Sequence, residues 1–250
     1  MAASVPKNAL VTGAGRRIGR AIVLDLARAG WSVAVHYHRS EDEANALIPE
    51  VLEVGGTAVT LNADLGNEEQ ATNLLPLAET AIGKITCLIN NASTFERDTV
   101  RTATRKTWDS HIEVNLRAPF LLSQAVIPNM KLNNWGRIVN ISSILGKISK
   151  EYRASYSSSK FGIDGMTAAL SAELSEYGIL ANCVGPGFIK TDLTAKMLGE
   201  AGIKEIEKQI PIKRFGNTKE IAELVSWLVS DSNTYLTGQN ILIDGGFSRI

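Results

Sequence analysis

The chain carries no net charge, few cysteines and no long apolar run, and each shortage excludes a class of protein. Its 250 residues include 26 basic and 26 acidic side chains, a balance that argues against nucleic-acid binding and against a polybasic membrane contact. No stretch approaches the roughly 18 apolar residues of a membrane span. The first residues, MAASVPKNALVTG, lack the sustained apolar core of a signal peptide. We therefore expect a cytoplasmic protein that binds neither nucleic acid nor membrane.

Disulfides and metal sites are not expected either. The two cysteines, Cys87 and Cys183, each lie in an apolar strand-like run, which predicts buried reduced thiols. His36 and His38 have no third ligand at a useful spacing, so no metal site is predicted. A chain of this length buries roughly three quarters of its unfolded surface and needs no such cross-links.

Apolar strand-like runs alternate with amphipathic helical stretches along the whole chain. Strands are expected at 9–12, 33–35, 58–61, 87–89, 137–141, 179–184 and 241–243. Helices are expected at 18–29, 41–54, 68–82, 106–131 and 154–177. This alternation is typical of parallel strands joined by right-handed crossovers. The sequence predicts an α/β fold with a doubly wound, seven-stranded parallel sheet and helices on both faces, in a single domain of residues 1–250.

The segment 185–209 resists regular assignment at its start. It begins Gly-Pro-Gly and later shows weak helical periodicity. Irregular segments beside the last strands of such a sheet are usually lids or substrate loops. We expect a substrate loop here, with a plain surface excursion as the alternative.

A glycine-rich turn lies between the first expected strand and the first expected helix. It reads Thr12-Gly-Ala-Gly-Arg-Arg-Ile-Gly19, the context that a phosphate-binding loop requires. Glycines there permit a tight turn and let backbone N–H groups approach a pyrophosphate, and the helix N-terminus adds free donors. The pattern predicts a Rossmann-type dinucleotide site, with contacts from Gly13, Gly15, Arg16, Arg17, Ile18 and Gly19.

The end of the second strand indicates which dinucleotide binds. An acidic residue there would accept hydrogen bonds from the ribose 2′-hydroxyl of NAD. This chain instead offers Tyr37, His38, Arg39 and Ser40, with no carboxylate before Glu41. Arg16 and Arg17 stand nearby in the loop, and an arginine fork with a serine hydroxyl suits a 2′-phosphate. We expect NADPH in preference to NADH.

Tyr156 and Lys160 stand four residues apart in an expected helix, so they lie one turn apart on one face. A phenol normally keeps its proton up to pH about 10. A fixed ammonium nearby favours the phenolate and makes the phenol a better acid. The pair alone is common on surface helices, and the other motifs give it its meaning.

Together these motifs resemble the short-chain dehydrogenase/reductase family, and the resemblance covers essentially the whole chain. Its further motifs are Asn90-Asn-Ala92, Asn115, Asn140-Ile-Ser-Ser143, Pro186-Gly187 and Asp244-Gly-Gly246. The resemblance implies that Tyr156 is the general acid and that Lys160 lowers its pKa and holds the nicotinamide ribose. Ser143 would hydrogen-bond the substrate oxygen, with Ser142 pointing elsewhere, and Asn115 would position a water in a proton relay.

The resemblance also implies the remaining cofactor contacts. Asp64 would accept from the adenine amino group. The other implied contacts are Leu65, Asn91, Ala92, Ser93, Pro186, Gly187, Ile189 and Thr191. Asn91 and Ala92 would line the ribose, and Pro186, Ile189 and Thr191 the nicotinamide amide.

Two subgroups of the family share the likeness. Arg17, Ser93, the run 36–40 and Phe95 look like pteridine reductases, in which Phe95 could stack on a pterin. From Ser143 onward, notably in 185–192, the chain looks more like 3-oxoacyl-carrier-protein reductases. The basic docking residues of those reductases are absent, however, since Asn134 and Tyr177 stand at the matching positions. Substrate contacts are expected from Phe95 and Phe188.

These observations predict an NADPH-dependent oxidoreductase that reduces a ketone, with 3-oxoacyl thioesters included, to a secondary alcohol. One alternative is reduction of a pteridine or another C=N bond. A second is a dinucleotide-binding regulator without catalysis. The resemblance further implies a small-molecule substrate and a homotetramer assembled through the helices at 106–131 and 154–177.

Overall fold

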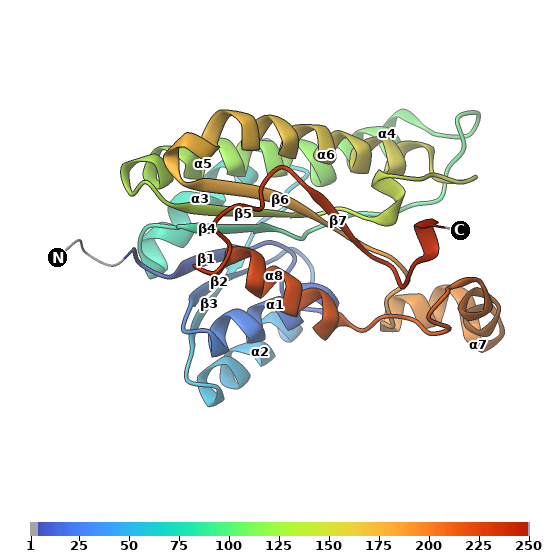
Figure 1. Cartoon of the computed structure of the whole chain (residues 1–250), viewed down its shortest axis with the longest axis horizontal. Coiled ribbons are helices and arrows are strands. Elements are labelled where there is room, and N and C mark those ends of the chain that lie inside the picture. Colours follow the sequence, from blue (N-terminus) through green and yellow to red (C-terminus); the bar gives the residue numbers. More distant parts are fainter. Residues whose placement is uncertain (1–4, 250) are drawn as a thin grey trace.

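A single parallel sheet forms the centre of the molecule (Figure 1). The computed structural model describes residues 5–249, and its strands pair in the order β3-β2-β1-β4-β5-β6-β7. The strands are β1 (Asn8–Val11), β2 (Ser32–Tyr37), β3 (Thr57–Asn62), β4 (Cys87–Asn90), β5 (Gly136–Ile141), β6 (Ile179–Pro186) and β7 (Asn240–Ile243). The predicted doubly wound, seven-stranded sheet is confirmed, with strand ends shifted by one or two residues.

Helices cover both faces of the sheet (Figure 1). One layer holds α1 (Arg17–Arg28), α2 (Glu41–Glu53) and α8 (Thr218–Val229). The other holds α3 (Glu68–Ile82), α4 (Arg105–Ile112), α5 (Ala118–Leu132) and α6 (Ala154–Leu174). The helix α7 (Asp192–Gln209) lies beyond the sheet at the end where the strands finish. Short turns complete the chain: η2 (Ile144–Gly146), η3 (Ser175–Tyr177) and η4 (Phe247–Arg249).

The core consists of two apolar clusters, one on each face of the sheet. Neighbouring residues of β1 point to opposite faces, so that Val11 joins one cluster and Leu10 the other. In β4, Ile89 and Leu88 divide in the same way. Strands buried on both faces read as continuous apolar runs rather than as alternating ones. This is why the central strands were recognisable from sequence.

The helices differ from the sequence prediction in three places. The helix expected at 106–131 is interrupted by a π-helical turn, η1 (Glu113–Arg117), between α4 and α5. The segment 185–209 is mostly helical from Asp192 onward, with a break at Gly199, whose φ is 63°. The helix α8 was not predicted, although Asn217 and Glu220 form a capping box at its start, a signal readable in sequence.

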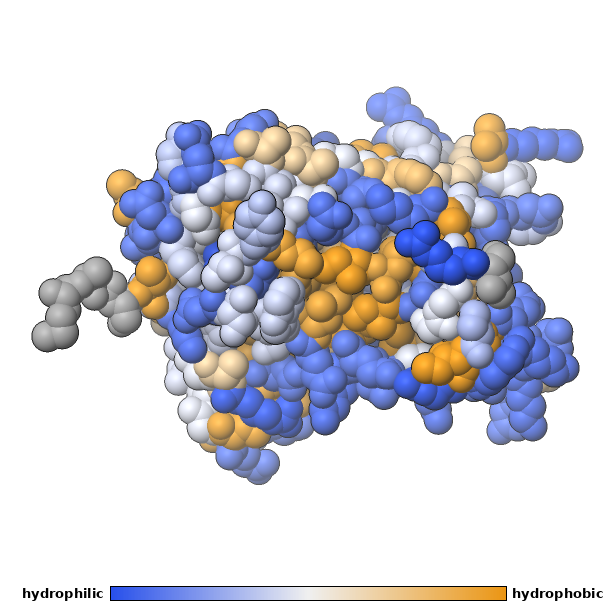
Figure 2. Space-filling model, in the orientation of Figure 1, coloured by the Kyte–Doolittle hydropathy of each residue, from blue (hydrophilic) through white to orange (hydrophobic). Residues whose placement is uncertain are grey.

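The edge strand β7 borders an apolar area of the surface. Figure 2 shows this area between β7 and α8. Ile241 and Ile243 of β7 are only partly buried and pack against the core cluster of that face. An edge strand with apolar, half-covered side chains is suited to contact with another surface.

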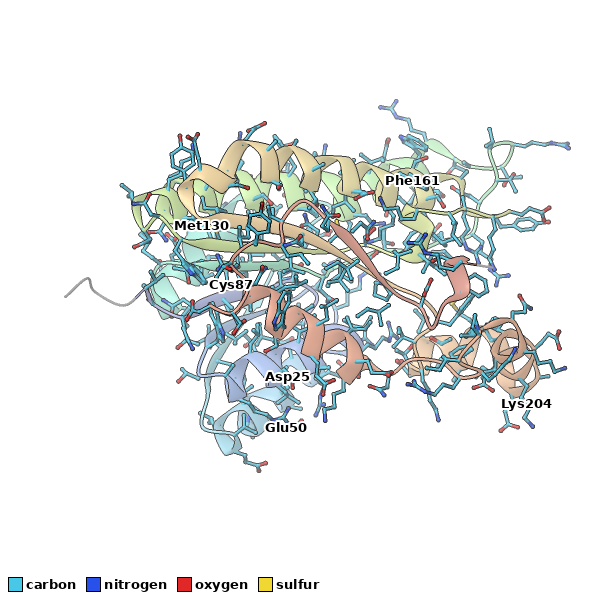
Figure 3. The ribbon with its side chains drawn as sticks, viewed as in Figure 1. Asp25, Glu50, Cys87, Met130, Phe161 and Lys204 are labelled. Atoms are coloured by element: carbon cyan, nitrogen blue, oxygen red, sulfur yellow. The ribbon has the colours of Figure 1, made fainter. Side chains whose placement is uncertain are left out.

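Both cysteines are buried free thiols, as predicted. Cys87 lies within the sheet, at the start of β4 (Figure 3). Between residues 5 and 249, no helix is both long and apolar enough to cross a membrane.

Strand order places a crevice at one end of the sheet. From the centre of the sheet, β1, β2 and β3 follow one another toward one edge, and β4, β5, β6 and β7 follow one another toward the other edge. Crossovers therefore diverge between β1 and β4, and ligands of such sheets bind there, outside the carboxyl ends of the strands. The loops after β1, β2, β4, β5 and β6 carry most of the predicted site residues.

Candidate active site

The glycine-rich loop after β1 is fastened to the end of β4. Thr12 Oγ1 accepts hydrogen bonds from the backbone N–H groups of Asn91 (2.9 Å) and Ala92 (3.0 Å). In return, Asn91 Nδ2 donates to the carbonyls of Thr12 (2.9 Å) and Gly13 (3.0 Å). Asn91 and Ala92, predicted to line a ribose, therefore also hold the loop in place.

A buried histidine holds the same loop from the other side. His36 Nδ1 lies 3.0 Å from the Gly13 nitrogen, whose hydrogen it accepts. The other ring nitrogen, Nε2, lies 3.0 Å from the carbonyl of Ala63 and donates to it. Burial lowers the pKa of His36 to about 4, so the ring is neutral at pH 7. The sequence placed His36 just after the expected strand at 33–35 and gave no sign of this positioning role, because its partners lie in other loops.

The start of α1 has the features that a pyrophosphate needs. Gly13 adopts a φ of +60°, which glycine accommodates freely. No side chain caps the first N–H groups of α1, and its first turn contains no acidic residue. Free N–H donors at a helix N-terminus form a ready anion site. The residues present therefore fit the phosphates of a dinucleotide.

The two arginines of the loop point to different places. Arg16 pairs with Glu43 of α2 at 3.2 Å, on the side of β2. Arg17, with a φ of 55°, donates from Nε and Nη2 to both carboxylate oxygens of Asp192, at 2.6 and 2.9 Å. The Arg17 guanidinium holds the pKa of that carboxyl well below its usual range. Of the two, only Arg16 lies on the side expected for a 2′-phosphate, and Arg17 ties the loop to α7.

The residues after β2 form a small polar group. Ser40 is buried and its Oγ would lie 3.0 Å from a Cβ placed on Gly15, so loop and strand end are in contact. Tyr37 donates from its hydroxyl to Glu41 at 3.2 Å, and His38 Nδ1 lies 3.7 Å from Asp64. Arg39 is exposed, and no ion pair of the described residues includes it. The guanidinium of Arg39 and the hydroxyl of Ser40 therefore remain available to bind a ligand at the end of β2.

Lys160 is a buried cation. It is 2% exposed, and its Nζ donates to the carbonyl of Ile141 at 2.9 Å, at the end of β5. Burial lowers its pKa to about 8. Ser142 is directed away from the crevice, as expected, because its Oγ donates to the Lys160 carbonyl. Two hydrogen bonds of Lys160, to Ile141 and Ser142, thus join the end of β5 to α6.

Tyr156 lies one helical turn before Lys160, whose Nζ is 5.6 Å from the centre of the phenol ring. Burial raises the pKa of Tyr156, while hydrogen bonds with Ser143 and Ser93 and the charge of Arg153 counteract part of that rise. Lys160, expected to lower the tyrosine pKa, is thus accompanied by two serine hydroxyls and by the charge of Arg153. The hydroxyl groups of Ser143 and Ser93 are its hydrogen-bond partners.

Asn115 lies in the π-helical turn η1 and is fully buried. Its Oδ1 accepts from the Thr94 nitrogen (2.8 Å) and from Ser93 Oγ (3.1 Å). Its Nδ2 donates to the Thr94 carbonyl (3.0 Å) and to Ser159 Oγ (3.1 Å). An asparagine amide makes four hydrogen bonds at most, so the side chain has none left for a relay water.

The remaining predicted cofactor residues lie around the crevice with structural partners of their own. Asp64 Oδ1 accepts from the Gly66 nitrogen at 2.9 Å, and the following Leu65 belongs to the core. After β6, which ends at Pro186, the Gly187 nitrogen donates to the Ile243 carbonyl at 2.8 Å. Ile189 is buried, and Thr191 caps the start of α7.

The two predicted substrate residues differ in position. The ring of Phe95 meets that of Tyr156 edge to face, with centroids 5.0 Å apart. Phe188 lies in an aromatic cluster with Phe215 and Phe247, at 5.6 and 5.1 Å. Phe95 is therefore adjacent to the predicted acid, and Phe188 lies where the loop after β6 meets the end of the chain.

Known proteins resemble this chain over nearly its whole length. A family model described as enoyl-(acyl carrier protein) reductase matches residues 13–248. The chain belongs to the short-chain dehydrogenase/reductase family. A 3-oxoacyl-[acyl-carrier-protein] reductase of Staphylococcus epidermidis is 36% identical over 240 residues, 96% of this chain and 98% of that protein. One from Synechocystis is 36% identical over 248 residues, 98% of each.

Solved structures of other dehydrogenases have the same fold as this chain. Acetoin dehydrogenase from Enterobacter cloacae superposes with a TM-score of 0.90 at 31% identity, over 98% of this chain and 96% of that one. A gluconate 5-dehydrogenase from Burkholderia cenocepacia, in complex with NADP and tartrate, gives 0.90 at 28% identity and the same coverage. This short-chain dehydrogenase/reductase is an oxidoreductase acting on CH–OH and C=O groups. That prediction is confirmed, and the alternative of a regulator without catalysis was wrong.

The contact between Gly19 and the loop gives a test of the phosphate end. A Cβ at Gly19 would meet the Gly13 oxygen at 2.5 Å and Asn91 Nδ2 at 2.6 Å. We expect Gly19→Ala to displace the loop and weaken dinucleotide binding at least tenfold, measured by fluorescence titration. Gly165→Ala in α6 is the matched control, because its Cβ meets nothing within 4 Å. It should stabilise the fold by about 0.5–1 kcal/mol and leave binding unchanged; equal binding by both variants would contradict this assignment.

Proposed function

We propose that the chain is an NADPH-dependent reductase that converts a ketone to a secondary alcohol, with residues 1–250 acting as one catalytic domain. The observation that carries the proposal is the buried group at the ends of β5 and α6. There a phenol has the hydroxyl of Ser143 as partner and the ammonium of Lys160 at 5.6 Å from its ring. The uncapped helix α1 supplies anion-binding donors at the same end of the sheet.

The cofactor assignment rests on charge at the end of β2. Arg39 and Ser40 suit a 2′-phosphate, and the first carboxylate after the strand, Glu41, already accepts from Tyr37. Two related structures were solved with the phosphorylated cofactor: the gluconate 5-dehydrogenase with NADP, and a blue fluorescent protein from a metagenomic library with NADPH. The latter is 33% identical to this chain. We therefore propose NADPH in preference to NADH.

Bound NADPH would supply the hydride to the carbonyl carbon. The protein's part is to hold the carbonyl oxygen and to protonate it. In the proposed step Ser143 donates a hydrogen bond to that oxygen while Tyr156 transfers its phenolic proton to it. The phenolate that remains is stabilised by the positive charge of Lys160, through which a proton returns from solvent. Burial of the whole group strengthens each of these interactions.

A pteridine substrate has less support. Two protein groups already contact the Phe95 ring on which a pterin would stack, namely the Tyr156 ring and, at 4.9 Å, the Arg153 guanidinium. The relatives named above are a 3-oxoacyl reductase, an acetoin dehydrogenase and a gluconate dehydrogenase, which favours a carbonyl substrate. A 3-oxoacyl thioester is one such substrate.

A cytoplasmic homotetramer is the proposed form of the enzyme. Buried free thiols suit a reducing compartment. Large apolar side chains lie exposed on the helices implied for assembly, with Phe120 of α5 at 49% and Phe161 of α6 at 46%. Figure 3 labels Phe161 on α6. The apolar area along β7 (Figure 2) adds a second face. Sedimentation velocity tests the assembly, and a monomer would contradict it.

Removal of the phenolic hydroxyl tests the chemistry. We expect Tyr156→Phe to lower kcat for ketone reduction by about 10²–10⁴-fold, the range of general acid catalysis, with NADPH binding retained. The assay follows NADPH oxidation with acetoacetyl thioesters, small diketones and dihydropterins. Tyr235→Phe, at a residue that is 95% exposed, should behave as wild type. Full activity in Tyr156→Phe would refute the mechanism, and activity on pterins alone would reverse the choice of substrate.

Removal of the positive charge of Arg39 tests the proposed preference for NADPH over NADH. We expect Arg39→Ala to lower the preference for NADPH over NADH by about tenfold or more, because a charge-assisted hydrogen bond to the 2′-phosphate is lost. The measurement is the ratio of kcat/KM for the two cofactors. Arg105→Ala, on the exposed start of α4, is the matched control. An unchanged ratio in Arg39→Ala would show that the phosphate is bound elsewhere.

A further inference from the structure

A pocket rich in positive charge opens next to the active site. It is an open surface pocket of about 520 Å³ and is lined by Arg97, Lys150, Glu151, Tyr152 and Arg153. Two segments far apart in sequence form it, the loop between β4 and α4 and the turn that precedes α6. Figure 1 shows both beyond the carboxyl ends of the strands, and a backbone bridge between Asp98 and Arg153 joins them.

The three cations of this pocket have no partners in ion pairs. Among residues 5–249, no salt bridge includes Arg97, Lys150 or Arg153. Two carboxylates lie near. Glu151 lines the pocket, whereas Asp98 is buried and accepts hydrogen bonds from the backbone nitrogen and the hydroxyl of Ser155. The carboxylate of Asp98 is thus occupied at the start of α6, and the pocket keeps an excess of positive charge.

The cations also repel one another. Burial, followed by the charges of Arg153 and Arg97, holds the pKa of Lys150 below its usual value. Burial and the charge of Arg97 do the same to the pKa of Arg153. Three cations held together with one carboxylate, Glu151, in the pocket lining still repel one another, and an anion placed among them relieves that repulsion.

Each side of the pocket reaches a residue of the catalytic crevice. The Arg153 guanidinium lies 4.9 Å from the centre of the Phe95 ring, and that ring packs on Tyr156. Lys150 Nζ lies 5.8 Å from the centre of the Phe188 ring. One aromatic ring therefore separates Arg153 from the predicted proton donor. A substrate bound at Tyr156 would meet Arg153 by extending past the Phe95 ring.

We propose that Arg97, Lys150 and Arg153 bind an anionic group of the substrate, a carboxylate or a phosphate, and so select charged ketones. The inference rests on the proposed function, because it concerns the substrate of that same site. The short path past Phe95 favours a carboxylate a few bonds from the carbonyl, as in an oxo acid. Arginine is suited to this task, since its planar fork matches both oxygens of a carboxylate.

The experiment compares charged and neutral ketones of equal reach. Purified full-length enzyme with NADPH is assayed on 3-, 4-, 5- and 6-oxo acids, each paired with its methyl ester. A second arm compares acetoacetyl coenzyme A with the acetoacetyl thioester of N-acetylcysteamine, which lacks the phosphates. Faster reduction of the acids than of their esters identifies a carboxylate as the bound group. Equal rates in that arm, with faster reduction of the coenzyme A thioester in the second, identify a phosphate.

We expect the acid-to-ester ratio of kcat/KM to exceed ten in the wild type and to fall about tenfold or more in Arg153→Gln, the loss expected for one charge-assisted hydrogen bond. Lys150→Gln and Arg97→Gln should lower the ratio as well. Arg153→Lys should restore part of it, which a merely structural role of Arg153 would not predict. Arg101→Gln removes one exposed charge from the same loop outside the pocket and should leave the ratio unchanged.

The outcomes separate this inference from the proposed function. If the wild type reduces esters and acids equally, or if its preference persists in all three glutamine variants, the inference is wrong while the reductase assignment stands. If no ketone of either kind is reduced, the proposed function fails and this inference fails with it. Because turnover of the methyl esters reports intact catalysis in each variant, misfolding cannot be mistaken for lost selectivity.

Discussion

The burial of one positive charge is the constraint on which the catalytic centre depends. Lys160 is almost completely enclosed, and its Nζ donates to the Ile141 carbonyl at the end of β5. Burying an ammonium is costly unless polar groups compensate, so the position of this side chain fixes how α6 crosses the end of β5. That crossing in turn fixes Tyr156, one turn earlier on the same face, and brings Ser143 to it. The same burial lowers the pKa of Lys160 to about 8. At this pKa the side chain can both release and take up a proton near neutral pH.

The cofactor end and the substrate end of the crevice are built differently. The loop after β1 is held by Thr12, Asn91 and the neutral ring of His36, all through short hydrogen bonds to backbone. It presents uncapped N–H donors in a fixed arrangement. The substrate end is instead formed by loops whose three cations, Arg97, Lys150 and Arg153, outnumber the one carboxylate in their pocket, Glu151. The pairing of Arg17 with Asp192 connects the two ends, because it joins the phosphate loop to α7.

Sequence was sufficient for the features that depend on local pattern. Continuous apolar runs such as those of β1 and β4 identified the strands, and the motifs around Gly13, Asn115 and Tyr156 identified the family. The π-helical turn at Asn115 was not predicted, since a single π turn within a longer helix has no composition of its own that marks it. The directions of Arg16 and Arg17 were equally inaccessible, because their partners, Glu43 and Asp192, lie far along the chain. The balance of effects on the Tyr156 pKa required knowledge of burial.

The most direct test of the central claim is the pH dependence of kcat/KM for ketone reduction. Lys160 is charged below its pKa and neutral above it, so its support of the phenolate is present below pH about 8 and is lost as the pH rises through that value. The account predicts a rate that is level near neutrality and declines above pH about 8. A rate that stays constant or increases from pH 7 to 10, in enzyme shown to remain folded, would contradict it.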